Sequence, residues 1–201
     1  MGCSDTAAPR TRGRHIALLL EYPTIYGGEN SILTCCSELS SLGYTFSVIC
    51  PPGDRMIHAL NDRKIPHHVF FFRDAFGMRY PLQKLRRDLS GMLQGLQIDA
   101  LHANSLSTAR IAGPVGEALK IPTLGHIRDI MRVSKQAMHD INTCNLILCV
   151  SKATLLYHRQ AGLDESRSIV QYNGVNLDVF FPATGTMTLR DRFGIKKQNF
   201  V

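Results

Sequence analysis

The stretch His15-Ile16-Ala17-Leu18-Leu19-Leu20 decides the fold, because an unbroken apolar run of this length is typical of a strand buried on both faces of a parallel sheet. A turn with Gly27 and Gly28 follows the run. From Glu29 the apolar residues recur at helical spacing until Gly43 stops the pattern. A buried strand, a glycine turn and an amphipathic helix together predict the first βα unit of a parallel sheet.

The same alternation of strand and helix patterns continues along the chain, with short connections. We expect further strands at residues 45–50, 68–71, 98–102, 122–126, 146–150 and 168–171. Helical spacing occurs between them at residues 54–63, 82–96, 107–119, 134–142 and 151–162. The pattern predicts an α/β, Rossmann-like, doubly wound parallel sheet of about seven strands. In such sheets a ligand sits beyond the carboxyl ends of the strands, near the point where the strand order reverses.

Composition and charge narrow the class of protein. Hydrophobic residues make up 44% and charged residues 19%, which is typical of a soluble folded domain, and we expect a cytoplasmic protein. The net charge of +7 indicates either a solvated basic surface or attraction to a polyanion or an anionic membrane face. A short N-myristoylation pattern at the N-terminus also leaves peripheral contact with the inner face of a membrane open. No aromatic residues interleave with the basic ones, so we expect no nucleic-acid partner.

The six cysteines form no Cys-x-x-Cys pair, and the sequence therefore gives no support for a zinc site. We expect no metal and no cofactor.

The turn after the first strand is the first candidate binding element. Gly27 and Gly28 allow a ligand to approach the backbone closely, and Glu29 and Asn30 begin a helix whose free N–H groups favour an anion. An ordinary turn from strand to helix also favours glycine, so this pattern alone does not decide between the two.

Polar residues also follow two later strands of the predicted sheet. They are His102 and Asn104 after one strand, and His126, Arg128 and Asp129 after the next. A buried core does not carry such charges unpaired, so this pattern indicates a polar site. We expect Gly28, His102 and His126 to converge on one cleft at the carboxyl edge of the sheet.

Several segments match a known family in order and spacing. They are Gly27-Gly28-Glu29-Asn30-Ser31, Asp99-Ala100-Leu101-His102-Ala103-Asn104, Leu124-Gly125-His126-Ile127-Arg128-Asp129, Val150-Ser151-Lys152, Ala161-Gly162-Leu163 and Asn173-Gly174-Val175-Asn176. Together they resemble glycosyltransferase family 4, from about His15 to the end of the chain. The last three segments resemble the place where the first domain of that family gives way to its linker.

The resemblance implies the N-terminal, acceptor-side half of a two-domain GT-B enzyme. Such an enzyme transfers a sugar from a nucleotide-sugar donor to an acceptor with retention of configuration and without a metal. By resemblance His126 is the catalytic residue, close to the transferred sugar, and Gly27 and Gly28 lie near the donor phosphates. The side chains assigned to the acceptor are Glu29, Asn30, His102, Asn104, Arg128 and Asp129. The acceptor itself is expected to be a sugar, a lipid-linked molecule or another small molecule.

The predicted division of the chain has three parts. Residues 1–14 are expected to form a disordered leader, residues 15–182 the Rossmann-like domain, and residues 183–201 a linker and the start of a C-terminal domain. The family holds its donor in that second domain. We therefore expect the chain to be inactive alone, with a tail from about Asn173 that has no partner domain to pack against.

Two other classes of function are consistent with parts of this pattern. A nicotinamide-dependent oxidoreductase requires Gly-x-Gly-x-x-Gly after the first strand and an acid after the second, where this chain has Cys50-Pro51-Pro52. A non-catalytic binding module derived from a glycosyltransferase remains the main alternative.

Overall fold

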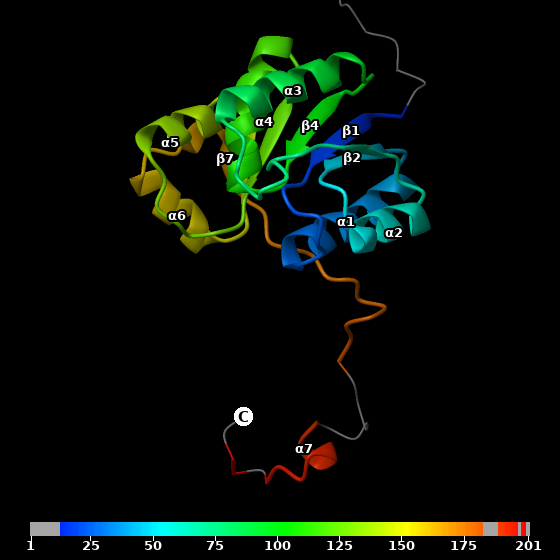
Figure 1. The fold of residues 1–201 in the computed structure, drawn as a ribbon. Coiled ribbons are helices and arrows are strands. Elements are labelled where there is room, and N and C mark those ends of the chain that lie inside the picture. Colours follow the sequence, from blue (N-terminus) through cyan, green and yellow to red (C-terminus); the bar gives the residue numbers. More distant parts are fainter. Residues whose placement is uncertain (1–12, 183–188, 197, 200–201) are drawn as a thin grey trace, which may run out of the picture.

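The computed structural model describes residues 13–182, 189–196 and 198–199. Most of the predicted leader, with its acylation pattern, and much of the segment 183–201 lie outside the described residues. The described part contains one parallel sheet of seven strands in the order β3-β2-β1-β4-β5-β6-β7 (Figure 1). This confirms the predicted fold class.

The ends of each strand lie within two residues of their predicted positions. They are β1 (His15–Leu19), β2 (Thr45–Cys50), β3 (His67–Val69), β4 (Ala100–Ala103), β5 (Thr123–Ile127), β6 (Leu146–Cys149) and β7 (Ser168–Val170). The α-helices are α1 (Gly27–Ser41), α2 (Asp54–Asp62), α3 (Leu82–Gln94), α4 (Leu106–Leu119), α5 (Lys135–Asn142), α6 (Lys152–Gln160) and α7 (Leu189–Arg192). A 3-10 turn at Glu165–Arg167 and the short helix α7 were not predicted by the periodicity.

Strand β1 lies inside the sheet, and its two neighbours, β2 and β4, begin the two parts that the chain builds on either side of it. Leu18 is in register with Val48 of β2 on one side and with His102 of β4 on the other. From β1 the chain first builds outward to β3, and after α3 it returns to build β4 to β7. The strand order therefore reverses between β1 and β4, where a ligand crevice is expected.

The helices cover the two faces of the sheet unequally (Figure 1). Alternate residues of β1 face opposite ways, so Leu18 packs with apolar residues of α1 and α2, while Leu19 packs with those of α3, α4 and α5. Helices α1 and α2 extend only over β1 to β3. On the same face of the sheet, no helix of the described residues covers β4 to β7, which we call the open half of the sheet. The segment of residues 171–178, which follows β7, lies near this open half.

Helix α4 packs unusually close to its neighbours because two of its residues lack a side chain. A Cβ at Gly116 would lie 1.8 Å from Thr123 Oγ1 of β5, and one at Gly113 would lie 2.6 Å from the carbonyl oxygen of Asp140. The helix begins at Ser105, whose hydroxyl accepts the N–H of Thr108 at 3.1 Å.

One buried carboxylate joins the three helices of that layer. Asp140 of α5 binds Arg86 Nη2 of α3 at 2.8 Å and Arg110 Nε of α4 at 3.2 Å, and it accepts a further hydrogen bond from Gln136. The carboxylate therefore compensates two cations that would otherwise stay partly buried without a counter-charge.

Candidate functional site

The guanidinium of Arg128 is the centre of the polar network at the carboxyl edge. Its Nε donates to the backbone and side-chain oxygens of Asn104, both at 3.2 Å, and its Nη2 donates to Asn104 Oδ1 at 2.7 Å. Nη2 also lies 3.2 Å from His126 Nδ1, and Nη1 donates to Asn173 Oδ1 at 3.0 Å. Arg128 follows β5, so one side chain connects the ends of β4 and β5 with the segment after β7.

Asn104 connects Arg128 with the start of α1. Its Oδ1 accepts from Arg128, and its Nδ2 donates to the carbonyl oxygen of Gly28 at 3.2 Å. A Cβ at Gly28 would lie 3.1 Å from Arg128 Cδ, whereas a Cβ at Gly27 would meet nothing within 4 Å. Gly28 therefore permits close packing on Arg128, while open space at Gly27 leaves room for a ligand.

The N-terminus of α1 adds free donors to this edge. The first intrahelical bond runs from the N–H of Asn30 to the carbonyl of Tyr26 at 2.8 Å. The N–H groups of Gly27, Gly28 and Glu29 therefore precede the regular ladder of the helix. The helix dipole places partial positive charge at the same point, which favours an anion.

His102 of β4 and His126 of β5 form a stacked pair, with ring centroids 5.6 Å apart and 24° between the planes. The Nε2 atom of each ring is buried and has no hydrogen-bond partner among the described residues. Burial lowers the pKa of His126 to about 3, with a further contribution from Arg128. Burial, together with His126 and Arg128, lowers the pKa of His102 to about 3. Both rings are therefore neutral near pH 7.

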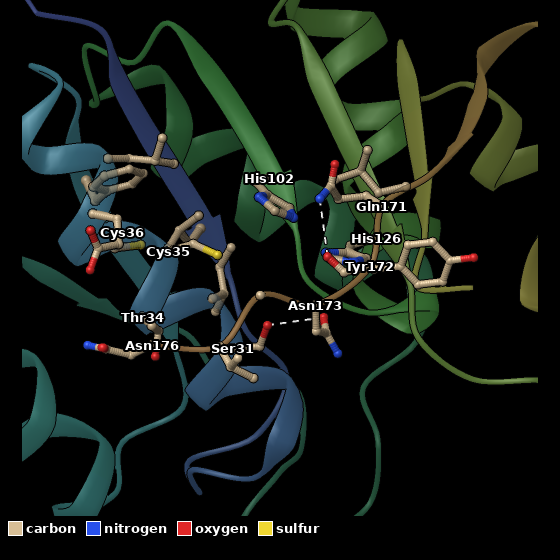
Figure 2. A pocket seen from close by; sticks show the side chains of 18 of the residues that line it. Ser31, Thr34, Cys35, Cys36, His102, His126, Gln171, Tyr172, Asn173 and Asn176 are labelled. Atoms are coloured by element: carbon tan, nitrogen blue, oxygen red, sulfur yellow. Dashed lines mark hydrogen bonds between the residues drawn. The ribbon is translucent and has the colours of Figure 1, made fainter. Parts of the chain in front are cut away.

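These side chains line a cavity of about 810 Å³ between α1, the open half of the sheet and the segment 171–178 (Figure 2). Ser31 of α1 donates to Asn173 Oδ1 at 3.1 Å, and Figure 2 shows the two side chains facing one another. Asn173, where the tail was expected to begin, therefore contacts α1 and Arg128 of the same domain, and the expectation that the tail has no partner domain to pack against stays a prediction. The amide of Asn173 fixes this stretch to α1 and Arg128, and the apolar residues beyond it stay exposed.

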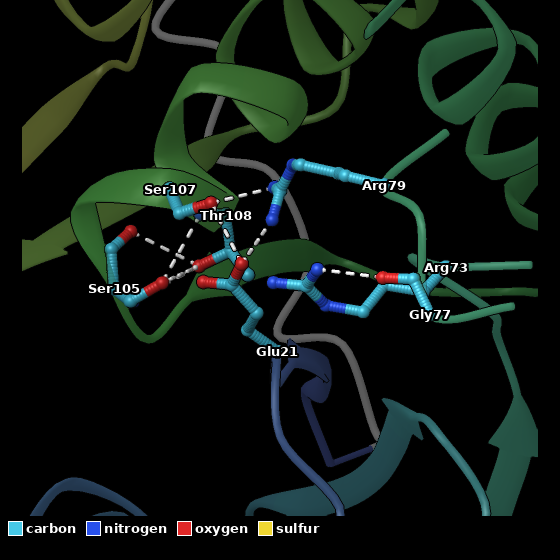
Figure 3. Close-up of polar contacts among 7 residues, drawn as sticks. All are labelled: Glu21, Arg73, Gly77, Arg79, Ser105, Ser107 and Thr108. Carbon is cyan, nitrogen blue, oxygen red and sulfur yellow. Dashed lines mark hydrogen bonds and ion pairs between the residues drawn. The ribbon is translucent and has the colours of Figure 1, made fainter. Parts of the chain in front are cut away.

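A second polar cluster lies where the strand order reverses (Figure 3). Glu21, just after β1, forms an ion pair with Arg79 and accepts from the hydroxyl of Ser107 at 3.1 Å. Arg79 Nη2 donates to the same hydroxyl at 2.7 Å. Sequence reasoning missed these three residues, because no motif marks them. The predicted reversal of strand order was the one signal that could have directed attention there.

The structure brings together five of the residues that the sequence assigned to a site: Gly28, His102, Asn104, His126 and Arg128. The two histidines line one cavity together with Arg128, as expected, whereas Gly28 is joined to this group through its hydrogen bond with Asn104 and is not among the residues that line the cavity. Their roles toward donor and acceptor stay predictions.

Three other assigned residues, within the described part of the chain, form no hydrogen bond with Arg128 or Asn104. Asn30 is exposed on α1, and Asp129 is exposed with its carbonyl accepting from His158 Nε2 at 2.9 Å. The carboxylate of Glu29 is buried and accepts the N–H of Tyr26 at 3.2 Å, which is the contact of a helix cap. Acceptor binding by these three residues stays a prediction.

No group of three His, Cys, Asp or Glu side chains within residues 13–182, 189–196 and 198–199 could hold a metal ion. None of the helices in the described part of the chain is long and apolar enough to cross a membrane.

The fold and this edge define a doubly wound α/β domain of the kind that begins GT-B glycosyltransferases. The sequence from residue 25 to residue 179 matches the family described as Glycosyltransferase Family 4. The chain therefore belongs to glycosyltransferase family 4. Among curated proteins, none matches the sequence significantly.

Solved structures of glycosyltransferases share the fold. HepE (Alr3699) of Anabaena, in complex with UDP-glucose, aligns with a TM-score of 0.67 at 18% identity over 90% of this chain and 50% of its own. A glycosyltransferase from Rickettsia africae gives 0.68 at 18% identity, over 92% of this chain and 51% of its own. MurG of Acinetobacter baumannii gives 0.60 at 17% identity, over 81% and 46%. The chain thus spans about half the length of these structures, and at such identities the likeness establishes the fold alone.

Proposed function

We propose that this domain is the acceptor-side half of a retaining glycosyltransferase, which transfers a sugar from a nucleotide-sugar donor to an acceptor. One observation carries the proposal. In a chain of family 4, the N-terminus of α1, the neutral His126 and the cationic Arg128 converge at the carboxyl edge of the sheet.

The chemistry of this edge suits a diphosphate sugar. The N–H groups at Gly27 and Gly28 offer a binding site for phosphate oxygens, and the space beside Gly27 is open. The charge of Arg128 adds to the positive potential there. HepE, which shares the fold, has been solved with UDP-glucose, and this supports a nucleotide-sugar donor here.

The role proposed for His126 is to contact the transferred sugar. A neutral imidazole forms a hydrogen bond with a hydroxyl without bringing a second positive charge beside Arg128. The acceptor, a sugar, a lipid-linked molecule or another small molecule, would occupy the cavity lined by His102 and α1. Transfer at a cytoplasmic site, with peripheral contact to a membrane where the acceptor is lipid-linked, is part of the proposal.

The 201 residues alone should transfer no sugar at a useful rate. Holding donor and acceptor together in a reactive geometry contributes roughly 7–11 kcal/mol to lowering a barrier. The described part of this chain offers one helix terminus and Arg128 to a diphosphate, which supports weak donor binding and no turnover.

A binding module that takes an acceptor without transferring sugar is the second candidate. The cavity of about 810 Å³ favours it, because residues of this chain alone form its walls. Family membership argues against the nicotinamide-dependent alternative.

A transfer assay separates the two candidates. Residues 13–182 would be joined to the second half of a structurally similar glycosyltransferase, and hydrolysis and transfer would be followed with that enzyme's own nucleotide sugar. We expect turnover in the hybrid, none in the 201-residue chain, and a loss of at least about tenfold with His126→Ala. His139→Ala, on the exposed side of α5, is the matched control. A hybrid that turns over equally well with His126→Ala would contradict the proposed role.

A further inference from the structure

The contact between Arg128 and His126 fixes which ring nitrogen carries the proton. A guanidinium has only donors, so His126 Nδ1, 3.2 Å from Arg128 Nη2, must accept through its lone pair. A neutral ring that accepts at Nδ1 carries its hydrogen on Nε2. That Nε2 is buried, and no described residue accepts from it.

We propose that Arg128 is a positioning residue that holds His126 in the Nε2–H tautomer, so that substrate meets a hydrogen-bond donor and not a base. The inference rests on the proposed function for the identity of the substrate. What the inference adds is the role of the His126 imidazole at that same site. The matching chemical group on the ligand is an oxygen lone pair, as in a sugar hydroxyl or a phosphate.

Arg128 can act this way because it is itself held on two other sides. Its Nε and Nη2 both donate to Asn104 Oδ1, which turns the amide nitrogen of Asn104 toward the carbonyl of Gly28. Its Nη1 donates to Asn173. A single guanidinium thus orients the imidazole, the start of α1 and the segment after β7, which a lysine with its single nitrogen could not do together.

The surroundings of the ring support a neutral state. The charged and titratable groups near it are Arg128 itself, His102 on β4, and the groups that act on Arg128 from α1 and from the adjoining loop, which are Glu29, Cys35 and Asp129. Burial lowers the pKa of His126, and the cation of Arg128 lowers it further. The opposite tautomer would place an N–H against the N–H of the guanidinium, so it loses the hydrogen bond and gains repulsion.

The test is long-range ¹H–¹⁵N spectroscopy of the histidine rings in the whole 201-residue chain. In the wild type we expect His126 to show one pyrrole-type nitrogen at Nε2 and one pyridine-type nitrogen at Nδ1, unchanged from pH 8 to pH 5. The Nδ1–H tautomer in the wild type, or a ring that protonates above pH 5, would overturn the proposal without any variant.

The variant Arg128→Met then tests whether Arg128 is what holds His126 in the Nε2–H tautomer. We expect mixed tautomers of His126 and a pKa that rises, because a nearby like charge is removed while the larger effect of burial remains. Arg132→Met, at an exposed arginine four residues on, is the control and should leave both unchanged. A dispersed amide spectrum verifies that each variant is folded. If folded Arg128→Met keeps the wild-type tautomer and pKa, Arg128 is not the positioning group.

These outcomes are separate from those of the transfer assay. A hybrid that transfers sugar while His126 carries its proton on Nδ1 would overturn this inference alone. A pure Nε2–H tautomer in a hybrid without activity would leave it standing and overturn the proposed function.

Discussion

Acid should weaken the fold through the stacked histidine pair, and the size of the effect follows from the structure. His102 and His126 each have a pKa of about 3 in the folded chain, against an ordinary value of 6.5. Between these values the unfolded chain binds a proton at each ring and the folded chain does not. Stability therefore rises with pH in this window, and it falls as the pH is lowered from 6.5 toward 3.

The size of the loss in stability depends on how far the pH lies below 6.5, the ordinary pKa of a histidine. Each pH unit below 6.5 costs about 1.4 kcal/mol per ring for as long as the folded state excludes the proton. At pH 5 the two rings together should lower the free energy of unfolding by about 4 kcal/mol relative to pH 7. This is a large part of the roughly 5–15 kcal/mol by which domains are stable. Asp140 and Asp164, whose pKa values are also lowered, act at a lower pH than this.

Urea unfolding followed by circular dichroism, at half-unit steps from pH 7 to pH 5, measures the effect. The variant His102→Gln/His126→Gln should lose most of the pH dependence, while His139→Gln, at an exposed histidine, should keep it. Equal slopes for the wild type and the double variant would refute the reasoning, since they would show that the rings accept protons in the folded state.

Two further predictions concern packing. Gly116→Ala should destabilise the fold by about 1–3 kcal/mol in urea unfolding, because its Cβ would collide with β5, whereas Gly91→Ala, in open space on α3, should be neutral or stabilise by up to about 1 kcal/mol. If the two substitutions change the free energy of unfolding by the same amount, α4 does not lie as close to β5 as described. Asp140→Ala should cost about 3 kcal/mol, because two arginines lose their buried counter-charge, and Asp62→Ala, at an exposed pair on α2, should cost under about 1 kcal/mol. A small effect at Asp140 would show that the two arginines are solvated.

Strands β1 and β2 were predictable from sequence because most of their residues are buried and form short runs rich in apolar residues, whereas the edge strands β3 and β7 are short and partly exposed. The sequence predicted a reversal of strand order without placing it, and the structure puts it between β1 and β4. The periodicity also placed His102 and His126 at the ends of neighbouring strands, and the parallel register then brings them together.

The hydrogen-bond network was not predictable, because its members are distant in sequence and depend on side-chain direction. Arg128 was assigned to the acceptor, yet most of its donors bind within the protein. Asn173 looked like part of a turn, and only the path of the chain after β7 brings it to Arg128 and Ser31. The pair Glu21 and Arg79 depends on the path of the connection between β3 and α3, where no periodic pattern exists.

Chemical-shift mapping of the chain with UDP-glucose tests the central claim most directly, with a guanine nucleotide sugar as the comparison. If α1, His126 and Arg128 form the donor edge, at least one nucleotide sugar at millimolar concentration should shift the amides of Gly27 and Gly28 and the ring of His126. Binding should be far from saturated, because this chain supplies few contacts to the diphosphate. Shifts confined to the opposite, amino edge of the sheet would contradict the account. So would micromolar affinity, which requires a donor site built from other residues.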